Sequence, residues 1–172
     1  MKIKIIKVED NEFVEGEIIE ARKLNVVLPS ITDGWRFNFK KHSKNKDAQV
    51  FVLIIDGNNR IEGCLIFEMK DKVEPYMAFI EVAPHNRGDK KEFESIAGCL
   101  IAYACKLSFV YGKKWYTGWL AFDVQEETEE STLQLMAIYS KKYRAQRFAD
   151  TTIMLISPED GEWLINEYLK TE

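Results

Sequence analysis

The chain has 172 residues, of which 46% are hydrophobic and 12% aromatic. This length suits one domain, and this composition supplies a hydrophobic core, which excludes disorder as the general state. The formal net charge of −4 argues against a dedicated nucleic-acid-binding protein, because such proteins usually carry a basic excess. We therefore expect a single domain over residues 1–172, without nucleic acid as its partner.

The first residues alternate charged and apolar types, and the sequence has no run of about 18 apolar residues. This pattern predicts a cytoplasmic protein without a membrane partner. The three cysteines, Cys64, Cys99 and Cys105, form no CxxC or Cys/His pattern, so we predict no metal site. An odd number of cysteines also suits no disulfide framework, and we expect small buried side chains in a reducing compartment.

The first third of the chain predicts a strand, a helix and a turn. Apolar residues with a period of two predict a strand over about residues 3–8. From Phe13 to Leu24 the apolar residues have a helical spacing, and residues 29–34 form a turn-rich break. The segment Phe37–Lys46 is rich in lysine. A basic tract can contact phosphate, but a solvated helix face or loop is the preferred interpretation.

Three apolar runs follow and predict an antiparallel meander. Val50–Asp56 and Ile61–Met69 are separated by a Gly-Asn-Asn turn, which is typical of a hairpin. The third run, Tyr76–Ala83, lies between two prolines.

The remaining elements alternate between helix and strand. The longest helical stripe runs from Phe93 to Leu107, and Gly112 is the expected C-cap. A strand at residues 119–124, a helix at 131–143, a strand at 151–156 and a helix opened by Ser157 and Pro158 complete the chain. This order predicts an α/β domain of the α+β type, with a mixed but mainly antiparallel central sheet and helices on both faces.

One crossover has the features of an anion site. The strand Ala78–Ala83 is followed by a loop and then by a helix predicted to begin at about Glu92. Unpaired N–H groups and the helix dipole favour anions at such a junction, and Arg87, Lys90 and Lys91 add positive charge. Because the sequence has no Walker lysine and no GxGxxG, this signal alone does not identify a ligand.

Three segments around and after this crossover resemble the GNAT superfamily of acyl-CoA N-acyltransferases. They are Ile80-Glu81-Val82-Ala83-Pro84-His85-Asn86-Arg87-Gly88, Ser95-Ile96-Ala97-Gly98-Cys99-Leu100 and Ala137-Ile138-Tyr139. The resemblance covers about residues 50–169 and is greatest to a subgroup with a lengthened loop. It implies a GNAT-like fold and the transfer of an acetyl group from acetyl-CoA to a primary amine.

The resemblance also implies which residues bind the cofactor. In the family, a pattern of Arg or Gln, two residues, Gly, one residue, and Gly or Ala binds the CoA pyrophosphate. Arg87-Gly88 is one register; the preferred register begins at the helix and places Glu92, Ser95 and Ala97 on the pattern, although the first two depart from it. The predicted cofactor-binding residues are Val82, Ala83, Arg87, Gly88, Ser95, Ile96, Ala97, Gly98 and Cys99.

Two residues are predicted to be catalytic. Tyr139 matches the family's tyrosine that protonates the departing thiolate, and packing beside Leu135 and Met136 is the alternative. Glu81 lies in an apolar strand, where a carboxylate needs solvent or a partner. A general base is one hypothesis for it, an acid at an exposed edge or in a salt bridge is the other, and His85 and Asn86 are adjacent alternatives for the base.

The acceptor is expected to be a small-molecule or peptide amine, and a homodimer is left open. The departures at Glu92 and Ser95 motivate an alternative function, a GNAT-fold CoA-binding or regulatory module with weak or no catalysis. A third hypothesis, acetylation of charged tRNA, rests on the Lys40–Lys46 tract, and the acidic net charge counts against it.

Overall fold

The computed structural model describes residues 1–171 as a nine-stranded sheet with four α-helices. The strands are β1 (Lys2–Lys7), β2 (Glu12–Glu20), β3 (Gln49–Ile55), β4 (Ile61–Lys70), β5 (Glu74–Val82), β6 (Phe93–Glu94), β7 (Leu120–Asp123), β8 (Gln146–Arg147) and β9 (Ile153–Ile156). The helices are α1 (Phe39–His42), α2 (Ile96–Tyr111), α3 (Glu129–Tyr143) and α4 (Pro158–Tyr168). The order of the strands in the sheet is β6-β1-β2-β3-β4-β5-β7-β9-β8.

Antiparallel pairing joins β1 through β5. The hydrophobic runs predicted this pairing for β3, β4 and β5, and the β3–β4 hairpin turns at the expected Gly-Asn-Asn segment. The pairing of β5 with β7 is parallel, which makes the sheet mixed. The predicted fold class is confirmed. The long crossover between β5 and β7 contains α2, which is the kind of connection that parallel strands require.

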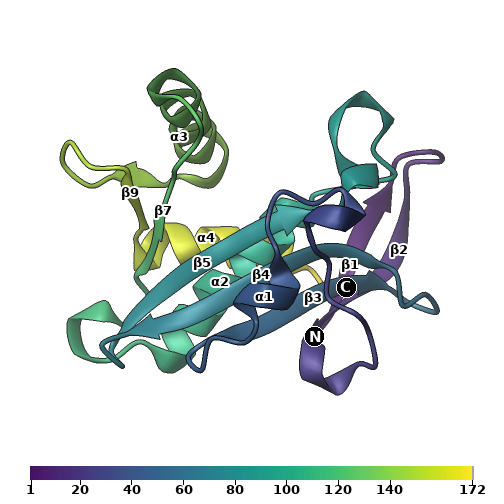
Figure 1. The fold of residues 1–172 in the computed structure, drawn as a ribbon, viewed down its shortest axis with the longest axis horizontal. Coiled ribbons are helices and arrows are strands. Elements are labelled where there is room, and N and C mark those ends of the chain that lie inside the picture. Colours follow the sequence, from purple (N-terminus) through teal and green to yellow (C-terminus); the bar gives the residue numbers. More distant parts are fainter. Residues whose placement is uncertain (172) are drawn as a thin grey trace.

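Both faces of the sheet are covered (Figure 1). On one face, α2 and α4 pack over a core that includes Leu53, Leu65 and Leu100. On the other face, α1 and the segment before it enclose Trp35 and Phe39 against the sheet. Figure 1 shows α3 beyond the point where β7 leaves β5, away from the centre of the sheet.

The helix predicted over Phe13–Leu24 is wrong, because most of this segment is the strand β2. It pairs with β1 through Ile5 and Val14 and with β3 through Leu53 and Ile18. Val and Ile suit a pleated surface, and two neighbouring strands outweighed the helical spacing of these residues.

The helix predicted from about Glu92 begins four residues later, at Ile96. Phe93 and Glu94 form β6 against Lys7 and Ile6 of β1. Ser95 then has a φ of 65°, in the left-handed region, which separates the strand from the helix. The C-cap at Gly112 and the Ser157–Pro158 start of α4 are confirmed.

Candidate functional site

Strands β5 and β7 diverge from their pairing (Figure 1), and a cleft lies between their diverging parts. Tyr76 and Ala121 are the one residue pair that joins these strands within residues 1–171. Ala78 forms a β-bulge in β5, because Ile66 pairs with Phe79 whereas Phe67 pairs with Met77. A bulge bends its strand and re-aims its groups. Beyond Met77, the edge of β5 that faces β7 therefore has backbone groups without a strand partner, and these can hydrogen-bond a ligand.

A cavity of about 90 Å³ lies in this cleft. It is lined by four segments, which contribute Arg36, Phe37, Met77, Ala78, Phe79, Ile80, Phe122, Asp123, Val124, Gln125, Glu126, Leu135 and Tyr139. These residues belong to β5, to β7 and the loop after it, to α3 and to the segment before α1. The cleft thus joins apolar strand residues to a few polar side chains, as is typical of ligand sites.

Tyr139 reaches this cavity from α3, and its ring lies 4.9 Å from that of Phe122, between ring centroids. Burial raises the pKa of the Tyr139 hydroxyl, and Glu126 raises it further, while Arg36 acts in the opposite direction. The phenol is therefore protonated at neutral pH and can donate a proton inside the cleft.

An ion pair joins two of the residues that line the cleft. Both terminal nitrogens of Arg36 donate to the carboxylate of Glu126, each at 2.9 Å. Arg36 precedes α1 and Glu126 follows β7, so the pair joins segments that are 90 residues apart in the sequence. Neither residue was singled out from the sequence, where Glu126 lies in an acidic run that also suits the start of a helix.

Glu81, the predicted base, is buried and has three donors. Its carboxylate accepts the backbone N–H of Arg36 at 2.8 Å and that of Phe37 at 2.9 Å, and it also pairs with the guanidinium of Arg87. The structure thus gives this side chain the salt-bridged environment that the sequence left open. Its direct effect is to hold residues 36 and 37 against the cleft.

The predicted cofactor residues around the end of β5 are engaged within the protein. Arg87 donates to the carbonyl of Val82 at 3.0 Å, in addition to its pairing with Glu81. The N–H of Ala83 donates to the carbonyl of Glu62 at 2.9 Å. Gly88 is exposed, with a φ of 67° that favours glycine.

The other five predicted cofactor residues lie at the start of α2. Ser95 is exposed, Ala97 is partly exposed and Ile96 is buried. Gly98 is covered by the ring of Tyr168, since a Cβ built on Gly98 would lie 2.3 Å from that ring. The thiol of Cys99 donates to the carbonyl of Tyr168 at 3.3 Å. The end of α4 therefore covers part of the first turn of α2.

A second cavity, of about 200 Å³, adjoins this first turn. Its lining includes Ser95, Cys99, Tyr168 and two lysines, Lys4 and Lys170. The structure thus brings Ser95 and Cys99 together at one cavity, while Tyr139 lines another.

A buried carboxylate, that of Glu62, lies beside the loop after β5 and was not predicted as a site residue. Glu62 is 0% exposed, and it accepts from Arg60 at 2.8 Å, His85 at 2.5 Å and Asn86 at 2.8 Å. Arg60 also donates to Glu92 at 2.5 Å and lowers the pKa of that carboxyl group. The charge of Glu92 is therefore paired, and Glu92 lies ahead of β6 and not in the first turn of α2.

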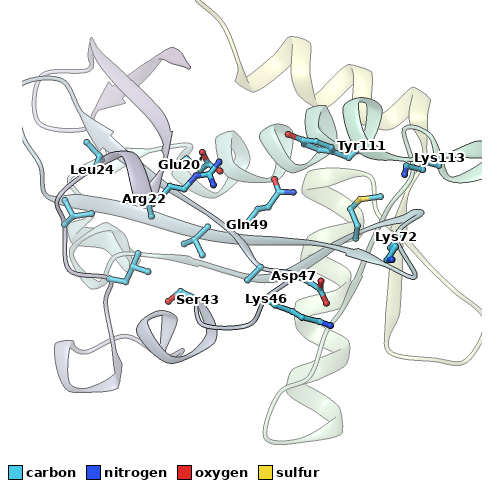
Figure 2. Close-up of a pocket in the computed structure, with 16 residues that line it drawn as sticks. Glu20, Arg22, Leu24, Ser43, Lys46, Asp47, Gln49, Lys72, Tyr111 and Lys113 are labelled. Atoms are coloured by element: carbon cyan, nitrogen blue, oxygen red, sulfur yellow. Dashed lines mark ion pairs between the residues drawn. The ribbon is translucent and has the colours of Figure 1, made fainter.

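A larger cavity lies away from the cleft (Figure 2). It has a volume of about 1000 Å³ and lies beside β3, the β4–β5 turn and the end of α2. Figure 2 shows Lys46, Lys72 and Lys113 around its rim, and Lys46 belongs to the basic tract noted in the sequence. None of the predicted catalytic or cofactor residues lines it.

For residues 1–171, two findings concern the predictions of no metal site and no membrane partner. Over this range, the structure has no group of three or more His, Cys, Asp or Glu side chains placed to hold a metal ion. None of its helices has both the length and the apolar character that a membrane span requires. The three cysteines are free and buried, as expected.

No protein-family model matches the sequence, and no curated protein sequence matches it. The AtaT–AtaR complex bound to DNA aligns with a TM-score of 0.55 and 14% identity over 87% of this chain and 97% of that chain. AtaTR bound with AcCoA aligns at 0.50 and 10% identity over 87% and 97%. A GNAT family acetyltransferase from Elizabethkingia anophelis with acetyl-CoA bound aligns at 0.49 and 12% identity over 83% and 97%.

AtaT is a GNAT acetyltransferase, so the first two likenesses show that this chain has the GNAT fold. The resemblance of the sequence to that superfamily is confirmed at the level of the fold. The lengthened loop remains a prediction.

Proposed function

We propose that this protein transfers an acetyl group from acetyl-CoA to a primary amine. The observation that carries the proposal is the position of Tyr139, which lines the cleft where β5 and β7 separate; burial there raises the pKa of its hydroxyl. The GNAT fold, which this chain shares with a structure bound to AcCoA, supports the choice of cosubstrate.

The donor groups of the cleft fit the acyl end of the cosubstrate. Amide groups of an extended arm can hydrogen-bond the free edge of β5 as an added strand would. Acetyl-CoA supplies a thioester, whose carbonyl carbon gains a bond to the amine nitrogen while its bond to sulfur breaks. The hydroxyl of Tyr139 gives its proton to the sulfur, and the proton released by the amine restores the phenol.

At the other end, the first N–H groups of α2 are the proposed contacts for the pyrophosphate. They belong to Ile96 and Ala97, beside the exposed Ser95, and the first turn of this helix has no acidic residue. Gly98 and Cys99 contribute here only if the end of α4 moves, because Tyr168 covers them. Arg87 acts through the loop, where it holds the end of β5.

Glu81 is proposed as a positioning residue. Its carboxylate fixes Arg36 and Phe37, which line the cleft, and both of its oxygens already accept hydrogen bonds, from three donors in all. A base needs a free lone pair directed at the proton it takes. The predicted role of Glu81 as the base therefore has less support from the geometry than a role in shaping the cleft.

The test combines binding with turnover. Acetyl-CoA is titrated by calorimetry, and thiol release is followed with a panel of primary amines. Replacing Tyr139→Phe should lower turnover by about 100-fold, because one general acid is lost, with little change in acetyl-CoA affinity. Tyr143→Phe is the matched control, since Tyr143 lies on the same helix but does not line the cleft. No binding at millimolar acetyl-CoA would overturn the proposal.

The cover over Gly98 favours a second candidate, a CoA-binding or regulatory module without turnover. If Tyr168 holds the first turn of α2 closed, the site can bind weakly without being productive. Binding of acetyl-CoA without thiol release across the amine panel supports this candidate. Thiol release that depends on both an amine and Tyr139 excludes it.

A further inference from the structure

Glu126 presents a carboxylate to the cleft from a fixed backbone. Its N–H donates to the hydroxyl of the buried Thr132 at 3.0 Å, and that hydroxyl donates to the carbonyl of Thr128. These bonds tie the loop after β7 to the first turn of α3. The side chain of Glu126 is 18% exposed, so its charge is largely removed from water and requires a cationic partner.

The present cationic partner of Glu126, the guanidinium of Arg36, is less firmly held than the carboxylate of Glu126. The side chain of Arg36 is 49% exposed, although its backbone is anchored to Glu81. The guanidinium can therefore leave Glu126 for solvent, where a charged group is well solvated. An incoming cation can therefore replace the guanidinium on Glu126 while the backbone of Arg36 stays in place.

The charges around the cleft favour a cation. Asp123, Glu126 and the adjacent Glu127 join Glu81 in this region, whereas Arg36 and Arg87 are the nearby cations that pair with them. A cleft with low-dielectric walls concentrates the field of such an excess and attracts ligands of the opposite sign. Glu126 and Tyr139 line the same cavity, so this carboxylate lies near the proposed acid.

We propose that Glu126 recognises a positively charged group of the acceptor, and that Arg36 occupies this position until the acceptor binds. The inference rests on the proposed function and narrows its substrate class to amines that carry a second cationic group, such as aliphatic diamines and polyamines. One nitrogen, uncharged, is acetylated, and the ammonium at the other end is held by Glu126.

Three acceptors of one chain length separate charge from size: 1,4-diaminobutane, butylamine and 4-aminobutyrate. The expected order of kcat/KM is diamine, then monoamine, then amino acid. In Glu126→Gln, the preference for the diamine over the monoamine should fall by about 10- to 100-fold, because a charge-assisted hydrogen bond is lost. The fall should come through KM. An unchanged preference would overturn the proposal.

Arg36→Gln gives the opposite readout. It vacates Glu126, so KM for the diamine should decrease, whereas Glu126→Gln should increase it. If the ion pair served only to hold the two segments together, both variants would impair the diamine in the same direction, and the proposal would fail.

Titration of 1,4-diaminobutane by calorimetry repeats this comparison without turnover. Affinity should fall in Glu126→Gln and rise in Arg36→Gln. A wild type that binds acetyl-CoA but acetylates no amine contradicts the proposed function, and the titration still decides the role of Glu126. Equal affinity of all three proteins for the diamine would reject that role.

Discussion

The buried carboxylate of Glu62 holds together three side chains from two loops. Arg60 precedes β4, and His85 and Asn86 follow β5. The ion pair and hydrogen bonds of Glu62 therefore fix both loops to the start of β4. Removal of the carboxylate would leave His85 without this partner, and the side chains of Arg60 and Asn86 would donate only to Glu92 and to the backbone carbonyl of residue 62. Buried polar groups without partners are costly, and this network should dominate local stability.

Replacing Glu62→Ala should therefore lower the free energy of unfolding by about 3–5 kcal/mol, as is typical when one partner of a buried ion pair is lost. Glu92→Ala is the matched control at the exposed end of the same network, and its cost should be below about 1 kcal/mol. Urea unfolding followed by circular dichroism measures both. Similar losses in the two variants would contradict this account of Glu62.

The sequence placed Glu81 and Tyr139 on elements that exist, but it left their partners undefined. Alternation along the strand indicated that Glu81 is not simply solvated, and it is buried. Its partners include the backbone of residues 36 and 37, about 45 positions earlier, and no local pattern predicts that contact. Arg36 and Glu126 were missed for the same reason, because their pairing depends on the tertiary structure.

Two glycines lie at the contact between α2 and α4, and they have different surroundings. A Cβ on Gly98 would meet the ring of Tyr168 at 2.3 Å, whereas a Cβ on Gly161 would lie 3.4 Å from the Cβ of Cys105. The second distance is an ordinary contact. Alanine favours a helix over glycine by about 1 kcal/mol at either position, so the packing decides the outcome.

Gly98→Ala should destabilise the protein by about 1–3 kcal/mol, because the inserted methyl group forces Tyr168 to move. Gly161→Ala should be neutral or stabilising by up to about 1 kcal/mol. Thermal and urea unfolding compare the variants. In the background of Tyr168→Ala, the cost of Gly98→Ala should largely disappear; a cost that persists would show that Tyr168 is not its cause.

Sequence patterns located most elements and failed where neighbours decided the structure. The hairpin of β3 and β4 is local, and its turn and the two apolar runs beside it were sufficient. The segment from Phe13 has a spacing that suits a helix, but strands on both sides made it β2. Phe93 fitted the apolar stripe of α2, yet pairing with β1 and the left-handed Ser95 assigned it to β6.

At the scale of the whole molecule, β5 and β7 diverge because of the sheet topology. The order of the elements could predict this divergence only in outline. A parallel pair held at one position, Tyr76 with Ala121, leaves an opening whose depth depends on side chains. Those side chains, including Arg36 and Glu126, come from segments on either side of the crossover. The fold could thus be predicted from the sequence, and the contents of the cleft could not.

The three cysteines predict how the whole molecule responds to alkaline pH. Burial raises the pKa of Cys99 and Cys105 from 9.0 to about 12, and it also raises the pKa of Cys64. The folded state keeps these thiols protonated, whereas the unfolded chain loses their protons above about pH 9. Their contribution to stability is therefore fully present below pH 9 and is lost as the pH rises from 9 toward 12.

Each thiol should remove about 1.4 kcal/mol from the free energy of unfolding per pH unit in this range. Urea unfolding under reducing conditions at pH 7.5, 8.5, 9.5 and 10 measures the decline before most tyrosines titrate. Cys105→Ala should lower the free energy of unfolding at every pH. It should also make the decline of that free energy above pH 9 less steep, by the contribution of one thiol. A stability that stays constant from pH 7.5 to 10, or a slope that Cys105→Ala leaves unchanged, would show that the thiols are not buried in solution as they are in the structure.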